Sequence, residues 1–392
     1  MAKRGNGQGA VYLRGDGRWE AQIRLAGGRR KSVYGPTRRE VVRRLRETRW
    51  LLAQGVPVSA RKMSVGLLLA SWLELTRERI RPSTYESYDL NMRRITEWLG
   101  DLPLVQLTAP DIQSAYRRMR ERGLTEYSLH QVHGLLDRAL RHALQWGLIV
   151  RNPAVLVFAP RPRRLEMTAL SAEQLMRLLD HARGHRLWPL MVVLGTAGLR
   201  IGEALGLRWR DVDLVAGRLV VRQALQRRRG VGLVFVEPKT PRSRRTVHLT
   251  TIAIEALAEQ RRCREERNLS APAWADSDLV FTNLSGGPIE PGNVNANLSR
   301  LLADAGLPRI RVHDLRHTTA TALLEAGAHP KLVQDLLGHS TIAVTLDTYS
   351  HVAPALHQRA AAQLQELLVK AGSDRFVSVM TAQGIEDKDR RA

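Results

Sequence analysis

The chain is poor in cysteine and in acidic residues, and each shortage excludes something. Cys263 is the only cysteine among 392 residues, so no disulfide can form within the chain and a cysteine-rich zinc site is excluded. The 38 acidic residues face 61 Lys and Arg residues, which gives a formal net charge of +23. Such an excess indicates a polyanionic partner, with nucleic acid as the first candidate and an anionic membrane surface as the second.

Long apolar segments are also missing. The sequence has no run of about 18 or more apolar residues, and the opening stretch MAKRGNGQGA has no apolar signal-peptide core. We therefore expect no membrane partner and a cytoplasmic, nucleoid-associated protein. The chain also lacks the G-x-x-x-x-G-K-[ST] loop and the H-E-x-x-H zinc motif, so we expect neither ATP nor a metal as cofactor.

Residues 1–58 predict a three-stranded sheet followed by a helix. Three alternating runs are separated by Asp-Gly at 16–17 and Gly-Gly at 27–28, and both pairs favour hairpin turns. The helix is expected to begin at Thr37, with Glu40 completing a capping box. Its arginine-rich face could be merely solvated, but the few acidic residues nearby favour contact with phosphates.

Residues 62–155 predict an all-helical domain. Ser83-x-x-Glu86 is expected to open one helix, and Thr108 to cap the next. Aromatic and apolar residues at helical spacing are expected to form the core. The Pro- and Arg-rich stretch that follows, within residues 156–167, predicts an extended linker.

Residues 168–372 predict the largest domain, and residues 373–392 a polar, disordered tail. Ser171 with Gln174 is expected to cap its first helix. The stretches RLVVRQAL, GLVFVEPK and RRTVHL are expected to be strands of one small antiparallel sheet among helices. The predicted fold class is therefore a multidomain protein, mainly α with small β-sheets.

Four stretches of this domain each supply a cation or a hydrogen-bond donor. They are GTAGLRIGEALGLRW with Arg200, EPKTPRSRRTVHL with Lys239, HDLRHTTATALL with His313 and Arg316, and LGHSTIAVTLDTYSH with His339 and Tyr349. A phenol has a pKa of about 10 and is a poor nucleophile at neutral pH. Surrounding cations favour the phenolate and a histidine can take its proton, so the pattern indicates a tyrosine nucleophile.

These motifs resemble the tyrosine recombinases, also called phage-type integrases. The boxes TAGLRIGEALGLRWRDVDL, HDLRHTTATALLEAG and LGHSTIAVTLDTYSH match the family's signatures in the right order. The resemblance implies an N-terminal arm-type DNA-binding domain, a helical core-binding domain and a catalytic domain over the three regions above. It implies a site-specific DNA recombinase, an integrase of a mobile element, that cuts and rejoins DNA through a 3′-phosphotyrosine.

The resemblance also implies a role for each site residue. Arg200 and Arg316 bind the scissile phosphate, and Tyr349 attacks the phosphorus. Lys239 protonates the leaving 5′-oxygen, His313 acts as a base or proton relay, His339 hydrogen-bonds the phosphate, and Glu203 holds the helix of Arg200. The implied partners are double-stranded DNA attachment sites and a homotetramer on synapsed DNA, with a directionality factor or a host DNA-bending protein as candidate accessory partners. The apolar stripe of residues 353–372 is expected to dock on a neighbouring protomer.

Some alternatives stay open. Arg242, Arg244 and Arg245 are rival cations to Lys239, and His313 and His317 have a spacing that could chelate a metal, although no carboxylate cluster accompanies them. A type IB topoisomerase-like nicking-closing enzyme and a catalytically silent DNA-binding regulator are the alternative functions. The complete set of nucleophile and cations argues against the silent regulator, and the extra basic N-terminal domain argues against the topoisomerase.

Overall fold

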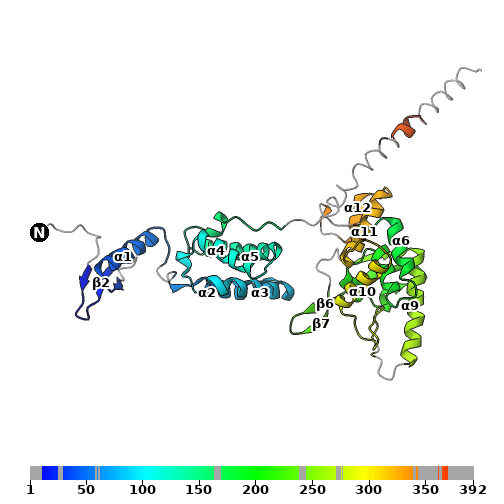
Figure 1. The fold of residues 1–392 in the computed structure, drawn as a ribbon, viewed down its shortest axis with the longest axis horizontal. Coiled ribbons are helices and arrows are strands. Elements are labelled where there is room, and N and C mark those ends of the chain that lie inside the picture. Colours follow the sequence, from blue (N-terminus) through cyan, green and yellow to red (C-terminus); the bar gives the residue numbers. More distant parts are fainter. Residues whose placement is uncertain are drawn as a thin grey trace, which may run out of the picture. The chain divides into compact units, whose positions relative to one another are not determined.

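The structure is a computed structural model whose chain divides into two compact units, residues 1–165 and residues 166–392. It describes residues 11–24, 30–57, 60, 62–162, 169–237, 244–270, 275, 277–338, 341–342, 361 and 364–369. Several predicted features lie outside these residues: Lys239, His339, Tyr349, residues 163–167 of the expected linker, most of the stretch 353–372, and the tail 373–392. Figure 1 shows each unit in the colours of the sequence.

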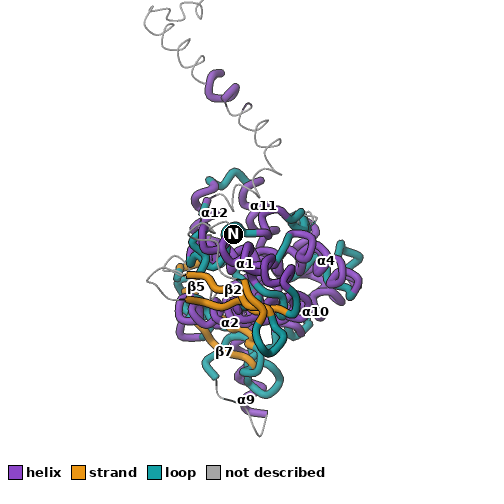
Figure 2. Tube along the Cα trace, turned by 90° about the vertical axis from the view of Figure 1, so that its left-hand side faces the viewer, coloured by secondary structure: helices purple, strands orange, loops and turns teal. Residues whose placement is uncertain are grey.

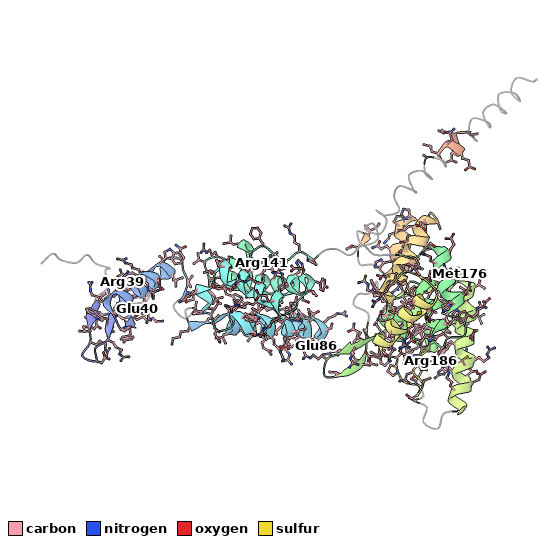
Figure 3. All side chains as sticks on the ribbon, viewed as in Figure 1. Arg39, Glu40, Glu86, Arg141, Met176 and Arg186 are labelled. Carbon is pink, nitrogen blue, oxygen red and sulfur yellow. The ribbon has the colours of Figure 1, made fainter. Side chains whose placement is uncertain are left out.

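The first unit begins with the predicted three-stranded sheet, which is antiparallel in the order β1-β2-β3. Its strands are β1 (Val11–Leu13), β2 (Trp19–Arg24) and β3 (Arg30–Gly35). Helix α1 (Arg38–Ala53) packs on this sheet and buries Val41 and Leu45 against it. Thr37 caps the helix by accepting the N–H of Glu40 at 3.3 Å. Glu40, labelled in Figure 3, bonds Arg44 instead of the Thr37 backbone, so only half of the predicted capping box forms.

The rest of the first unit is helical, as predicted. Its main helices are α2 (Val65–Thr76), α3 (Pro82–Leu99), α4 (Ala109–Glu121) and α5 (Glu126–Gln145). Thr108 caps α4 in a complete capping box with Asp111. The prediction that Ser83 opens α3 is wrong: the N-cap is Arg81, without a side-chain cap, and the helix starts at Pro82. Proline's fixed φ already suits the first helical position, so Ser83 falls inside the first turn.

The second unit is built around a helix that is buried on all sides. This helix, α7 (Trp188–Thr196), has every residue from Trp188 to Gly195 buried and packs against α6, α9 and α11. The main helices in the described part of this unit are α6 (Ala172–His181), α7, α8 (Ile201–Leu205), α9 (Thr251–Ser270), α10 (Pro291–Asp304), α11 (Val312–Glu325) and α12 (Pro330–Leu337). Ser171 and Gln174 form the predicted capping box of α6. The buried α7 gives the segment that follows it a rigid base.

The strands of the second unit form two sheets, so the prediction of one sheet is wrong. Strands β4 (Val212–Asp213), β5 (Arg218–Val221) and β8 (Arg245–His248) make one, and β6 (Ala224–Arg228) and β7 (Gly232–Val236) make the other. The stretch RLVVRQAL breaks at residues 222–223, where Gln223 donates to the Gly206 carbonyl at 2.9 Å. Strand β6 then packs on α8, where a Cβ at Gly202 would lie 2.6 Å from the Leu225 oxygen. The β6–β7 hairpin projects from the helical body (Figure 1).

Helices dominate the described residues, and the mainly α fold class predicted from the sequence is confirmed. Figure 2 shows this as a majority of purple helices around a few orange strands. No helix in the described part of the chain is both long and apolar enough to cross a membrane.

Candidate active site

Arg200 lies where the chain leaves the buried helix α7 and enters α8. Gly198 makes the turn with a φ of 60°, a conformation that favours glycine. The backbone N–H of Arg200 donates to Oε2 of Glu203 at 3.0 Å, and its Nη1 donates to Oε1 at 2.7 Å. Because Glu203 is buried while the Arg200 side chain is 39% exposed, the carboxylate fixes a guanidinium that still reaches solvent.

Arg316 lies on α11 and is almost completely buried, with 2% of its surface exposed. Its Nη1 donates to the Gly198 carbonyl at 2.7 Å, and its Nη2 donates to the Leu337 carbonyl at 2.5 Å. Burial, together with the charges of Arg200 and Arg245, lowers the pKa of Arg316 to about 9, although Glu203 opposes this shift. The guanidinium still carries its proton at neutral pH, and cations crowd the site.

Arg245, on strand β8, is a third arginine at this site. Its Nη2 donates to Oε2 of Glu203 at 2.9 Å, and its Nε donates to the Leu336 carbonyl at 2.6 Å. The residue is only 8% exposed. From the sequence, Arg245 was expected only as a rival cation to Lys239. The alternation of β8, in which Arg245 and Val247 are buried and Thr246 and His248 exposed, was the signal that could have placed it inside.

Glu203 is the anionic centre that these cations share. Burial acts to raise the pKa of its carboxyl group, but the hydrogen bond and charge of Arg245 and the charge of Arg200 outweigh it and hold the pKa below its ordinary value. The carboxylate is therefore ionised at neutral pH and bridges two guanidinium groups. Glu203 thus holds both the backbone and the guanidinium of Arg200, and its link to Arg245 was not expected from the sequence.

Three successive carbonyl groups at the end of α12 each accept a hydrogen bond from a different arginine. The Leu336 carbonyl accepts from Arg245, the Leu337 carbonyl from Arg316, and the Gly338 carbonyl from Arg200 at 3.2 Å. The last carbonyls of a helix have no partner within it and carry the negative end of its dipole, which favours cations there. We call these three arginines with Glu203 the arginine cluster.

His313 lies in the first turn of α11, three residues before Arg316. The residue is exposed, and its ring stands edge-on to that of His317 with a centroid distance of 5.0 Å. Partial burial, His317 and Arg316 lower the pKa of His313 to about 4. The imidazole is therefore neutral at neutral pH, the form with a nitrogen lone pair that accepts a proton, and the lowered pKa makes it a weaker base than an ordinary histidine.

The structure thus brings together four of the predicted site residues, Arg200, Glu203, His313 and Arg316. Lys239, His339 and Tyr349 lie outside the described residues. In the chain, however, His339 directly follows Gly338, whose carbonyl Arg200 holds. The described part of the site is a cluster of cations in which Arg200 reaches solvent and can meet an anionic ligand, with a neutral histidine beside it.

Two regions of the chain match known protein families. Residues 167–355 match the Phage integrase family, and residues 65–120 match the N-terminal SAM-like domain of phage integrases. Together the two matches include all of the arginine cluster and, in the first unit, helices α2 and α3 and all but the last residue of α4.

Named proteins of similar sequence extend over nearly the whole chain. A tyrosine recombinase XerC-like protein of Caldanaerobacter subterraneus subsp. tengcongensis is 28% identical over 361 residues, which cover 87% of this chain and 92% of that protein. An integrase of Saccharopolyspora erythraea is 26% identical over 424 residues, which cover 92% of this chain and 96% of that protein.

Solved structures show the same fold. The Tn1549 transposon integrase in complex with transposon right end DNA aligns with a TM-score of 0.64 and 27% identity, over 76% of this chain and 100% of that one. A lambda integrase tetramer bound to a Holliday junction aligns with a TM-score of 0.55 and 20% identity, over 88% and 96%. The chain therefore belongs to the phage integrase family of tyrosine recombinases, as its motifs predicted, and is a site-specific DNA recombinase.

Proposed function

We propose that this recombinase is the integrase of a mobile genetic element and that Tyr349 cuts DNA by attacking a phosphate held at the arginine cluster. The observation that carries the proposal is the cluster itself, which gathers three guanidinium groups at the end of α12, one residue before His339. Relatives named as integrases, among them the ICEBs1 integrase of Bacillus subtilis, support the mobile-element assignment.

The electrostatics of the cluster favour a phosphodiester ligand. Three guanidinium groups face one carboxylate, and the pKa of Arg316 is lowered first by burial and then by repulsion from Arg200 and Arg245. An anion beside Arg200 would relieve that repulsion and accept forked N–H donors. Phosphoryl transfer depends mainly on positioning and charge neutralisation, which such a cluster supplies.

Arg316 contributes to this site from a buried position. Both of its terminal nitrogens already donate to carbonyl groups, and almost none of the residue is accessible. Each of these nitrogens carries a second N–H. The proposed contact of Arg316 with the scissile phosphate therefore requires DNA binding to uncover one of those N–H groups, whereas Arg200 needs no such change.

The proposed reaction conserves the energy of the phosphodiester bond. The Tyr349 oxygen forms a bond to phosphorus while the bond to the 5′-oxygen breaks; His313 takes the phenol proton and Lys239 gives a proton to the leaving 5′-oxygen. His339 donates a hydrogen bond to the phosphate. A 5′-hydroxyl of another strand then attacks the 3′-phosphotyrosine and releases the tyrosine, so strand joining needs no nucleotide cofactor.

Double-stranded attachment sites are the proposed substrate, in the cytoplasm at the nucleoid. The Tn1549 integrase, 27% identical to this chain, was solved bound to DNA of the transposon end. Exchange between two duplexes needs four cleavages, which supports a homotetramer on the synapsed DNA. A directionality factor or a host DNA-bending protein is the proposed accessory partner.

The sheet and helix of residues 11–53 are the proposed arm-type DNA-binding element. Arg38, Arg39 and Arg46 are exposed on α1, and helical spacing places Arg39 on the side away from the buried Val41 and Leu45. Cationic side chains on one face of a helix suit contact with phosphates. Charge reversal of Arg39 is expected to weaken binding to arm-type DNA without changing cleavage of a core half-site.

Covalent trapping tests the proposed nucleophile. Wild-type protein incubated with a nicked suicide half-site should give an adduct that survives SDS, joined to the 3′ end of the cut strand. Tyr349→Phe should bind the same half-site with wild-type affinity and give no adduct. An adduct formed by Tyr349→Phe, or none formed by the wild type on its cognate half-site, would remove Tyr349 from its proposed role.

A further inference from the structure

We infer that Arg245 is a positioning residue for strand cleavage. It acts through Glu203 and the end of α12. In this way it fixes the position of Arg200 and of Gly338, the residue that precedes His339, for the reaction. The inference rests on the proposed function and adds a residue to the same site.

The contacts of Arg245 join two parts of the site that are far apart in sequence. Its Nη2 reaches Glu203, which in turn holds both the backbone N–H and the guanidinium of Arg200. Its Nε reaches the carbonyl of Leu336, 91 positions along the chain. One side chain on β8 therefore links the start of α8 to the last turn of α12.

Arg245 is shielded from solvent in the described structure. It is 8% exposed, whereas the side chain of its neighbour Arg244 is 56% exposed and pairs with Glu237. Both contacts described above engage protein groups rather than solvent. Its described contacts can therefore influence the reaction through Glu203 and α12.

Gly338 adds a steric link between Arg245 and the chain exit. The residue has a φ of 67° and caps α12, a conformation that favours glycine. A Cβ placed on Gly338 would lie 3.2 Å from both Cδ and Nη1 of Arg245. The guanidinium thus packs directly over the residue from which the chain continues to His339.

Removing Arg245 would disturb both of its partners. Glu203 would keep Arg200 but lose its other guanidinium, and its buried Oε2 would lose a charge-assisted hydrogen bond. The Leu336 carbonyl would lose its donor at the helix end. Arg200 and the exit of α12 would both become less fixed, while the exposed groups that meet DNA would remain.

The test separates cleavage from DNA binding. Arg245→Met is expected to lower the single-turnover rate of adduct formation on a suicide half-site by about 10- to 100-fold, with the half-site dissociation constant unchanged. The matched control is Arg208→Met, because Arg208 also is a mostly buried arginine on a carboxylate, Asp211, but outside the cluster. It should cleave at the wild-type rate.

Chemical rescue distinguishes positioning from a general loss of stability. Methylguanidinium added to Arg245→Ala should restore part of the cleavage rate by filling the vacated site, and should not accelerate the wild type or Arg208→Ala. Arg245→Lys keeps the charge, but its single nitrogen cannot occupy the places of both Nε and Nη2. It should fold and still cleave more slowly than wild type.

The outcomes that would contradict the inference about Arg245 differ from those that would contradict the proposed function. A wild-type cleavage rate in Arg245→Lys or Arg245→Met would contradict the positioning role of Arg245. So would a folded Arg245→Ala whose cleavage rate methylguanidinium does not restore. Loss of half-site affinity in step with the rate would make it a DNA-binding residue instead. If the wild type itself forms no adduct while Tyr349→Phe behaves identically, the proposed nucleophile fails instead.

Discussion

The guanidinium of Arg316 donates to the carbonyl of Gly198 at 2.7 Å, across 118 positions of sequence. This bond ties helix α11 to the turn between α7 and α8, beside Arg200. Thr319 strengthens the same junction, since its hydroxyl donates to the Gly195 carbonyl at 2.9 Å. The two arginines expected to hold the phosphate are therefore parts of one bonded framework, and substitutions in it should affect stability as well as chemistry.

Arg316→Lys should destabilise the fold although it keeps the charge. The single nitrogen of lysine cannot occupy the positions of both Nη1 and Nη2, so one buried carbonyl, of Gly198 or Leu337, loses its donor. We expect the free energy of unfolding to fall by about 1–3 kcal/mol in urea denaturation. Arg300→Lys, at an exposed position of α10, is the control and should leave it unchanged. Equal stability of both variants would contradict the buried framework.

Gly338→Ala should slow cleavage, and a second glycine separates the causes. Both Gly338 and Gly327 have positive φ values, 67° and 88°, so alanine at either position costs backbone strain of about 1–2 kcal/mol. Only at Gly338 does the new methyl group also meet Arg245, because nothing lies within 4 Å of a Cβ at Gly327. Adduct formation should therefore fall in Gly338→Ala and persist in Gly327→Ala. Similar rates in the two variants would show that the contact with Arg245 has no effect on the site.

Local sequence patterns predicted much of the fold and part of the site. The buried α7 follows from its continuous apolar run, and Thr108 and Ser171 cap their helices because a capping box involves residues only three apart. The four stretches that supply a cation or donor contain every residue of the arginine cluster, and three of these residues, Arg200, Glu203 and Arg316, were predicted for the site from the sequence.

Features that depend on distant contacts were not predicted. The break between β5 and β6 arises where Gln223 bonds Gly206 and β6 packs against α8, which no alternation within RLVVRQAL reveals. Arg245 looked like one of several cations in an arginine-rich stretch. Its partners, Glu203 and Leu336, lie 42 and 91 positions away, and only folding brings them to it.

Acid should destabilise the protein through His313. The folded state lowers the pKa of His313 to about 4 from an ordinary value near 6.5, through partial burial and the neighbouring His317 and Arg316. Between these values the unfolded chain binds more protons than the folded one, so the free energy of unfolding falls as the pH drops from about 6.5 toward 4. Denaturation in urea at pH 7 and pH 5 measures this fall.

The variant His313→Gln should show a smaller loss of stability between pH 7 and pH 5 than the wild type. His181→Gln, at an exposed position on α6, is the control and should lose as much as the wild type. Other groups titrate in the same range, among them His317, which also has a lowered pKa. The difference between the two variants therefore isolates the contribution of His313, and the absence of any difference would contradict the shift.

Cleavage should persist in excess EDTA. In the proposed mechanism the developing charge on the phosphate is neutralised by Arg200 and Arg316, whose charges belong to the chain and do not depend on a divalent cation. Adduct yield on a suicide half-site should be the same in EDTA and in Mg²⁺ at matched ionic strength. Matching is needed because DNA binding by a protein of net charge +23 weakens as salt rises. Loss of the adduct in EDTA, with recovery on adding Mg²⁺, would instead indicate that a metal ion supplies the charge that we assign to the arginines.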